Sequence, residues 1–169
     1  MRQKYKLDSD KKAYLQLDFA FAVLIFAFFV ISTYSYFKDY ESAQEDSIEI
    51  SILQADSRDI CYLLRNTPGE PSDWETQVGN ASFLGIKDVD LQSLNLDKMD
   101  VFNSSNYFIL QEEFGLNDSF VFISVDGLDT STNYLTFGFT GGSSTLSGSY
   151  SCYSNYNSEL ARIYVEVWK

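Results

Sequence analysis

An uncharged stretch of 19 residues runs from Phe19 to Phe37 and contains six phenylalanines. As a helix it would be about 28 Å long, which matches the hydrocarbon core of a bilayer. Lys12 and Lys38 bracket the stretch, and Tyr40 lies just beyond it, where membrane helices collect aromatic residues. The stretch is predicted to span a membrane. The alternative is a buried core helix of a soluble protein, but such helices rarely carry so many phenylalanines.

The charges on the two sides of this stretch differ. Residues 1–12 hold five basic and two acidic residues, whereas the rest of the chain holds seven basic and 22 acidic residues. The positive-inside rule therefore predicts a cytoplasmic N-terminus and an extracellular C-terminal part at the cell surface. The acid excess argues against nucleic acid as a partner, because phosphate binding needs a basic face.

The composition excludes many kinds of catalytic site. The chain has no His, which rules out Ser-His-Asp triads, Cys-His dyads and His-ligated zinc, and its two Cys cannot form a four-cysteine metal site. No phosphate-binding loop or dinucleotide motif is present. We therefore expect no enzyme activity, no cofactor and no metal site.

The residues just before the apolar stretch form a recognisable pattern. Lys11 and Lys12 precede a small residue, Ala13, and the acid Asp18 stands directly before Phe19. This pattern resembles the class III signal peptide of archaeal type IV pilins. The resemblance implies that a prepilin peptidase cuts between Ala13 and Tyr14, so that residues 1–13 are a cytoplasmic leader and residues 14–37 form the transmembrane or filament-core helix. A secretory signal peptide, cut near Ser35, is the alternative.

The resemblance also implies a role in assembly for Asp18 and Phe19. In pilin-like filaments the carboxylate at the fifth mature position, here Asp18, is thought to pair with the N-terminal amine of a neighbouring subunit. The chain would then be a major or minor subunit of a homo-oligomeric extracellular filament, held in membrane lipid before assembly, with adhesion as one role. The alternative is a monomeric, membrane-anchored surface protein that binds a glycan or a protein partner.

Residues 38–66 continue the helix as an amphipathic segment. Its apolar residues recur at spacings of three, four and seven, which is typical of one helix face. They are Ile48, Ile52, Leu53, Ile60, Leu63 and Leu64. Pro68 predicts an end just before it, because proline disfavours helix at the preceding residue. We expect one helix from Tyr14 onward, and the alternative is two helices with a break near Ser42.

The remaining residues, 67–169, are predicted to form an extracellular antiparallel sheet domain. Pro68, Pro71 and Trp74 mark a turn-rich segment whose role is interpreted as structural. Aromatic and β-branched runs predict four strands, at 107–111, 120–125, 134–139 and 161–168. The Gly/Ser-rich segment 140–152 is expected to be an exposed loop, 83–86 a short strand, and 91–102 is ambiguous. The fold class is therefore α+β, with a long N-terminal helix on a C-terminal antiparallel sheet, as in pilins.

Two kinds of covalent modification are predicted outside the cell. Cys61 and Cys152 are expected to form a disulfide, because both fall in the part predicted to be extracellular. Closing a loop of this length is worth about 4.6 kcal/mol in the chain-entropy model, and two buried free thiols are the alternative. Asn80, Asn103 and Asn117 each begin an N-glycosylation sequon.

Overall fold

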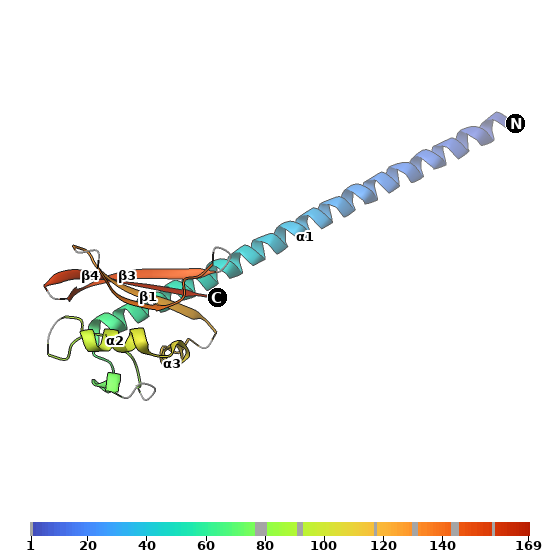
Figure 1. Ribbon diagram of the computed structural model, residues 1–169. Helices are drawn as coiled ribbons and strands as arrows, with labels where there is room; N and C mark the ends of the chain where they lie inside the picture. Colours follow the sequence, from blue (N-terminus) through green and yellow to red (C-terminus); the bar gives the residue numbers. More distant parts are fainter. Residues whose placement is uncertain are drawn as a thin grey trace. The chain divides into compact units, whose positions relative to one another are not determined.

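The structure is a computed structural model of the 169-residue chain. It describes residues 2–76, 81–90, 93–116, 118–129, 132–142, 146–156 and 158–169, with side chains from Leu17 onward. The chain divides into two compact units (Figure 1), Met1–Glu45 and Asp46–Lys169. We call the second one the sheet unit, and each unit is described by itself.

Helix α1 extends from Arg2 to Asn66 without interruption. No Gly or Pro occurs in this range, so no residue removes a backbone donor or favours a break. The predicted single helix is confirmed, and the alternative break near Ser42 is absent. The helix ends where predicted, before Pro68, and the amide of Thr67 donates to the carbonyl of Leu63 at 3.1 Å.

The sheet unit contains a four-stranded sheet formed by β1 (Phe120–Gly127), β2 (Asn133–Gly138), β3 (Ser147–Tyr156) and β4 (Glu159–Trp168). The strand order is β2-β1-β4-β3, and all neighbouring strands are antiparallel. The predicted α+β class, with a long N-terminal helix packed on an antiparallel sheet, is confirmed.

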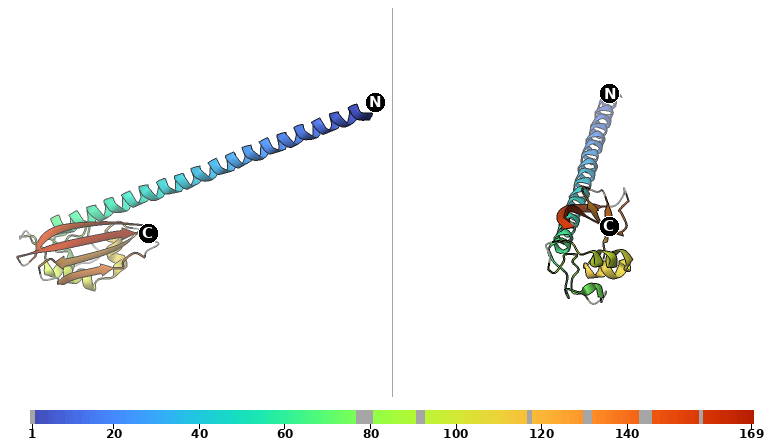
Figure 2. Two further views of the ribbon diagram at one scale, coloured as in Figure 1. Left: turned by 90° about the horizontal axis from the view of Figure 1, so that it is seen from above. Right: turned by 60° about the vertical axis from the view of Figure 1, so that its left-hand side comes forward.

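One face of the sheet is buried against helices. The last turns of α1 and the short helices α2 (Leu96–Ser104) and α3 (Tyr107–Glu113) lie on the same side of the sheet (Figures 1 and 2). The register explains the packing, because alternate residues of neighbouring strands point to one face. The strand side chains of this core are Val121, Ile123, Val125, Leu135, Phe137, Cys152, Tyr156, Ala161, Ile163, Val165 and Val167.

The predicted strand at 107–111 is wrong, because these residues form α3. The side chain of Asn106 caps the helix by accepting a hydrogen bond from the amide of Phe108 at 3.0 Å. The aromatic residues then serve tertiary packing: the ring of Tyr107 stacks on Phe137 at 5.3 Å, and its hydroxyl accepts from the amide of Val121 at 2.8 Å. Capping and packing together override the strand propensity of this run.

The Gly/Ser-rich segment was predicted to be a loop up to Cys152, and this prediction is wrong from Ser147 onward, where β3 begins. Strand β3 is at the sheet edge, where it pairs with β4 and makes one further bridge, between Asn155 and Ser93. Its buried positions are Gly148, Cys152 and Tyr156. Two of these residues are small, so the sequence does not show the alternation of large apolar and polar residues by which a strand is recognised. At 83–86 the structure has a single bridge between Glu70 and Phe83 in place of a strand.

The predicted apolar face of the outer helix is only partly buried. Leu53, Ile60 and Leu64 are in the core, whereas Ile48 and Ile52 are 61% and 56% exposed. The buried face is completed by Ser57 and Cys61, which continue the spacing of three and four residues. They belong to the packed face because the sheet approaches α1 closely there.

Candidate functional site

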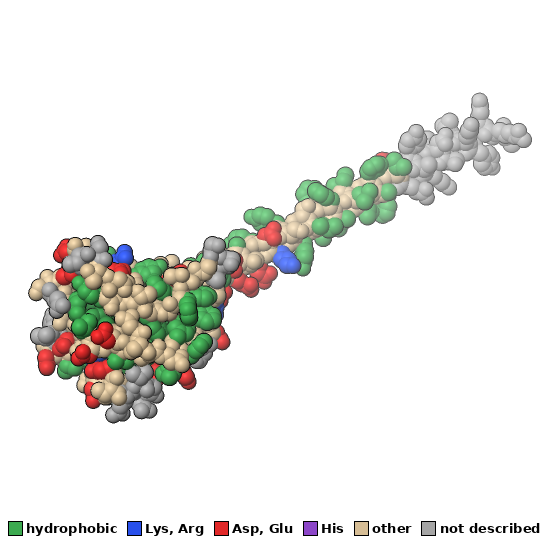
Figure 3. Space-filling model, viewed as in Figure 1, with side chains coloured by type: hydrophobic (Ala, Val, Ile, Leu, Met, Phe, Trp, Pro, Cys, Tyr) green, Lys and Arg blue, Asp and Glu red, His purple; other side chains and the backbone are tan. Residues whose placement is uncertain are grey.

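The apolar segment of α1 is exposed around its whole circumference. Every described large hydrophobic side chain between Leu17 and Tyr40 is at least 48% exposed, and Phe19 and Phe26 reach 71%. Figure 3 shows hydrophobic side chains along this part of the helix. By length and composition, the described part of the chain contains one helix able to cross a membrane, which begins at Leu17.

This exposure has a large free-energy cost in water. Burying one Phe, Leu or Ile side chain is worth about 1.5–3 kcal/mol, and ten such side chains are exposed between Leu17 and Tyr40. An apolar surface of this extent marks a site of contact with lipid or with other protein chains. The segment is therefore the strongest candidate for a functional site.

The residues predicted for cleavage and assembly all lie on α1. Ala13 and Tyr14 are in its helical backbone, and their side chains lie outside the described ones. Asp18 is exposed and makes no hydrogen bond or ion pair with any described side chain. Phe19 follows it at the start of the exposed apolar surface. The geometry thus presents an exposed acid at one end of an apolar surface, and the roles of these residues in cleavage and assembly remain predictions.

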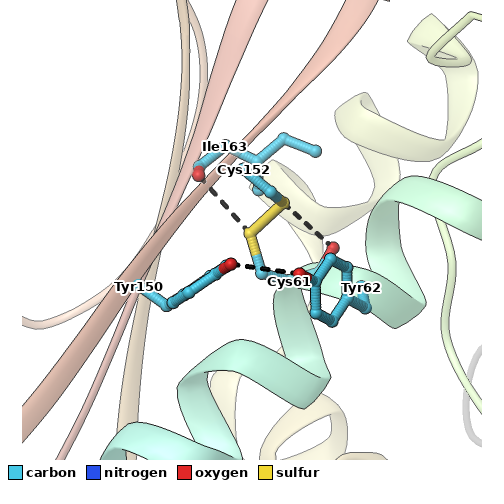
Figure 4. The surroundings of a disulfide bond; sticks show 5 residues. All are labelled: Cys61, Tyr62, Tyr150, Cys152 and Ile163. Carbon is cyan, nitrogen blue, oxygen red and sulfur yellow. Dashed lines mark hydrogen bonds between the residues drawn. A yellow bond between two sulfur atoms is a disulfide. The ribbon is translucent and has the colours of Figure 1, made fainter.

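A disulfide joins the outer part of α1 to β3. Cys61 and Cys152 are bonded, with their Cα atoms 6.2 Å apart, and both are buried (Figure 4). The sulfur of Cys61 lies 3.5 Å from the carbonyl oxygen of Ile163 on β4. On the exposed side, the hydroxyls of Tyr62 and Tyr150 hydrogen-bond to each other at 3.1 Å. The predicted disulfide is therefore present in the structure.

The sheet approaches α1 very closely at Gly148. A Cβ atom added there would lie 2.2 Å from the backbone nitrogen of Gln54, so only glycine fits without movement. The buried hydroxyl of Ser57 lies 2.6 Å from the carbonyl oxygen of Gly148 and 2.8 Å from that of Leu53. This hydroxyl satisfies polar groups at a contact that is otherwise closed to water.

A lysine that was not predicted from the sequence to be important holds the turn-rich segment after α1 in place by hydrogen bonds. Lys98 on α2 is 1% exposed, and its ammonium group donates to the carbonyl oxygens of Pro68 and of Ser72, the latter at 2.6 Å. Glu75 provides a carboxylate 3.8 Å away. Burial lowers the pKa of Lys98, and the nearby charge of Glu75 opposes this shift.

Trp74 completes this structural segment. It is fully buried, donates from its ring nitrogen to the carbonyl oxygen of Gly85 at 2.9 Å, and packs edge-on against Phe102 at 5.3 Å. Gly69 lies beneath it with φ +88, and an added Cβ would be 2.3 Å from the Trp74 ring. The structural interpretation of this segment agrees with these contacts.

Of the three sequons, the structure describes the Asn of one. Asn103 is exposed on α2, its amide nitrogen donates to the carbonyl oxygen of Tyr134 at 3.4 Å, and its amide oxygen accepts from the backbone of Thr136 at 3.1 Å. Its side chain therefore connects α2 to β2. Asn80 and Asn117 lie outside the described residues.

Within the described ranges, no three His, Cys, Asp or Glu side chains are grouped so as to hold a metal ion. Comparison of the chain with protein-family models, with curated proteins and with solved structures returned no match in any of the three.

Proposed function

We propose that this chain is a subunit of an extracellular filament of the archaeal type IV pilus kind. The observation that carries the proposal is the division of α1 into two parts with opposite surroundings. From Leu17 to Tyr40 its large apolar side chains are exposed, whereas Leu53, Ile60 and Leu64 are buried in the sheet unit. Such a helix offers one part to lipid or to other subunits and uses the other part to hold a folded unit.

The charge pattern supports a single-pass anchor before assembly, with the N-terminus in the cytoplasm. The Cys61–Cys152 bond supports an extracellular sheet unit, because disulfides persist in oxidising compartments. In an assembled filament the apolar segments would pack against one another away from water. Asp18 would then pair with the new amine of a neighbouring subunit, since a buried charge is tolerated only when it is paired.

The mature N-terminus of the native protein tests the pathway. Mass spectrometry is expected to find a chain that begins at Tyr14, which requires cleavage after Ala13. An intact Met1 would contradict the pilus pathway and favour the monomeric anchored protein. A chain that begins near Ser35 would contradict both, because it would lack the apolar segment.

Substitution of Asp18 tests the assembly role. We expect Asp18→Ala to reduce the yield of filaments at least tenfold, measured by electron microscopy of sheared cell-surface material. Asp39→Ala is the matched control, since it removes the same charge from an exposed position of the same helix beyond the apolar stretch. Normal filaments from Asp18→Ala would show that the pairing role is wrong, and equal losses in both variants would show that the effect is not specific to Asp18.

A further inference from the structure

Most basic residues of the sheet unit form ion pairs, and the two that form none with a described carboxylate both line one cleft. Residues 46–169 contain six Lys and Arg against eighteen Asp and Glu. Four of the six, Arg58, Lys98, Arg162 and Lys169, are in ion pairs with carboxylates. The other two, Arg65 and Lys87, form no ion pair with a carboxylate of the part of the chain that the structure describes. Acidic residues outnumber basic residues three to one in the sheet unit. The lack of an ion pair between Arg65 or Lys87 and any described carboxylate therefore needs an explanation.

Arg65 and Lys87 line the same cleft, which has a volume of about 530 Å³. Arg65 comes from the last turn of α1, and Lys87 from the connection that follows Ile86. The rest of the lining is largely neutral and polar. It includes Asn66, Tyr153, Ser154 and Asn155. None of the residues that line the cleft is acidic, so its two positive charges face an open space of ligand size.

The acids next to the cleft in sequence are engaged elsewhere. Asp88 accepts hydrogen bonds from the amide of Asp90 at 2.9 Å and from the side chain of Asn95 at 3.3 Å. Glu159 accepts from the amide of Asp129 at 2.9 Å and from the hydroxyl of Tyr134 at 2.7 Å. These carboxylates hold turns and strand ends in place, and neither Asp88 nor Glu159 lines the cleft.

The end of α1 does not require Arg65 either. The carbonyl of Leu63 already accepts from the amide of Thr67, and the carbonyl of Leu64 accepts from the amide of Ile86, both at 3.1 Å. A basic side chain in the last helical turn often serves to satisfy such carbonyls. At Leu63 and Leu64 that need is met by backbone amides, so these two carbonyls do not require the Arg65 side chain.

We infer that this cleft binds a carboxylated saccharide, that is, a sugar chain containing uronic acid units. Arginine recognises a carboxylate through two parallel hydrogen bonds, and lysine adds a second positive charge. Side-chain amides and hydroxyls, such as those of Asn66, Ser154 and Asn155, can donate to and accept from the hydroxyl groups of a sugar. An acidic peptide shares the carboxylates but offers this lining mainly backbone amides, whereas a sugar offers several hydroxyl groups per unit.

Calorimetric titration of the full chain in uncharged detergent, with trigalacturonate as the probe, tests the inference. We expect binding that weakens at high salt, and no binding of the uncharged maltotriose. Arg65→Gln and Lys87→Gln are each expected to weaken binding roughly tenfold or more, the range for a lost hydrogen bond to a charged group. Arg58→Gln is the matched control, because Arg58 lies on the same helix but is paired with Asp59.

Several outcomes would overturn the inference. They are no binding of trigalacturonate, equal binding of maltotriose, an equal loss in Arg58→Gln, or equally tight binding of triglutamate, which would assign the cleft to acidic peptides. Circular dichroism of each variant establishes that it is folded, and the two separate cleft variants guard against a single unfolded one. The titration is independent of filament formation, so its failure would leave the proposed function standing.

Discussion

Lys98 shows how one side chain can hold a loop that lacks secondary structure of its own. Its ammonium group is removed from water and faces the carbonyl oxygens of Pro68 and Ser72. Lys98→Met would keep the bulk of the side chain but leave both oxygens without this donor. We expect the free energy of unfolding to fall by roughly 1–3 kcal/mol, measured by chemical denaturation in detergent.

Lys87→Met is the control, because it removes the same charge from a side chain with no ion pair to a described carboxylate. The pH dependence adds a second measurement. Burial lowers the pKa of Lys98 below 10.5 in the folded chain. At pH values between this lowered pKa and 10.5, Lys98 is therefore protonated more fully in the unfolded chain than in the folded chain. The stability of the wild type relative to Lys98→Met should therefore rise as pH increases through this window. A difference that falls with pH would contradict this account.

Among the elements, the contact between α1 and β3 depends on the absence of a side chain at Gly148. We expect Gly148→Ala to lower the free energy of unfolding by roughly 1–3 kcal/mol, the usual cost of overpacking, since the new methyl group would meet the backbone of Gln54. Thermal unfolding followed by circular dichroism measures the effect. Gly142→Ala is the control, because an added Cβ there has no neighbour within 4 Å, and an equal loss in both variants would contradict the packing argument.

The elements that were predictable from sequence are those whose residues carry a strong local pattern. Helix α1 follows from an unbroken run without Gly or Pro, and β1, β2 and β4 follow from their aromatic and β-branched residues. Strand β3 was missed because its inward positions include Gly148 and Cys152, which do not look apolar in a sequence. Helix α3 was missed because the cap at Asn106 and the packing of Tyr107 decide its conformation.

The candidate sites divide in the same way. The apolar segment and the cysteine pair were visible because composition alone marks them. The cleft was not, because Arg65, Lys87 and Asn155 are far apart in sequence and meet only through the fold. Lys98 gave no signal either, since an isolated lysine is usually exposed and nothing local indicates that it will be buried.

At the scale of the whole molecule, the apolar segment decides where the chain resides. Phe28 is at the middle of the uncharged stretch and Phe37 is its last residue. A basic residue at the centre of a membrane helix costs about 2.5–3.5 kcal/mol, and much less near the interface. We therefore expect Phe28→Arg to reduce membrane integration strongly, and Phe37→Arg to leave it nearly unchanged.

Membrane integration can be measured as the fraction of chain that resists alkaline extraction from membranes. The two variants introduce the same side chain and differ only in depth, so they control for each other. Equal extraction of both would contradict a spanning segment centred near Phe28.

The bond between Cys61 and Cys152 also determines how the chain would respond to a pulling force. A force applied to the two ends of the chain would pass along α1 to Cys61, cross directly to Cys152, and continue through β4, since the two cysteines are separated by 91 positions in sequence. The enclosed residues, which include α2, α3, β1 and β2, would bear no tension while the bond is intact. Under load, only α1 up to Cys61 and the segment beyond Cys152 can be drawn out, and the enclosed part of the sheet unit is mechanically bypassed.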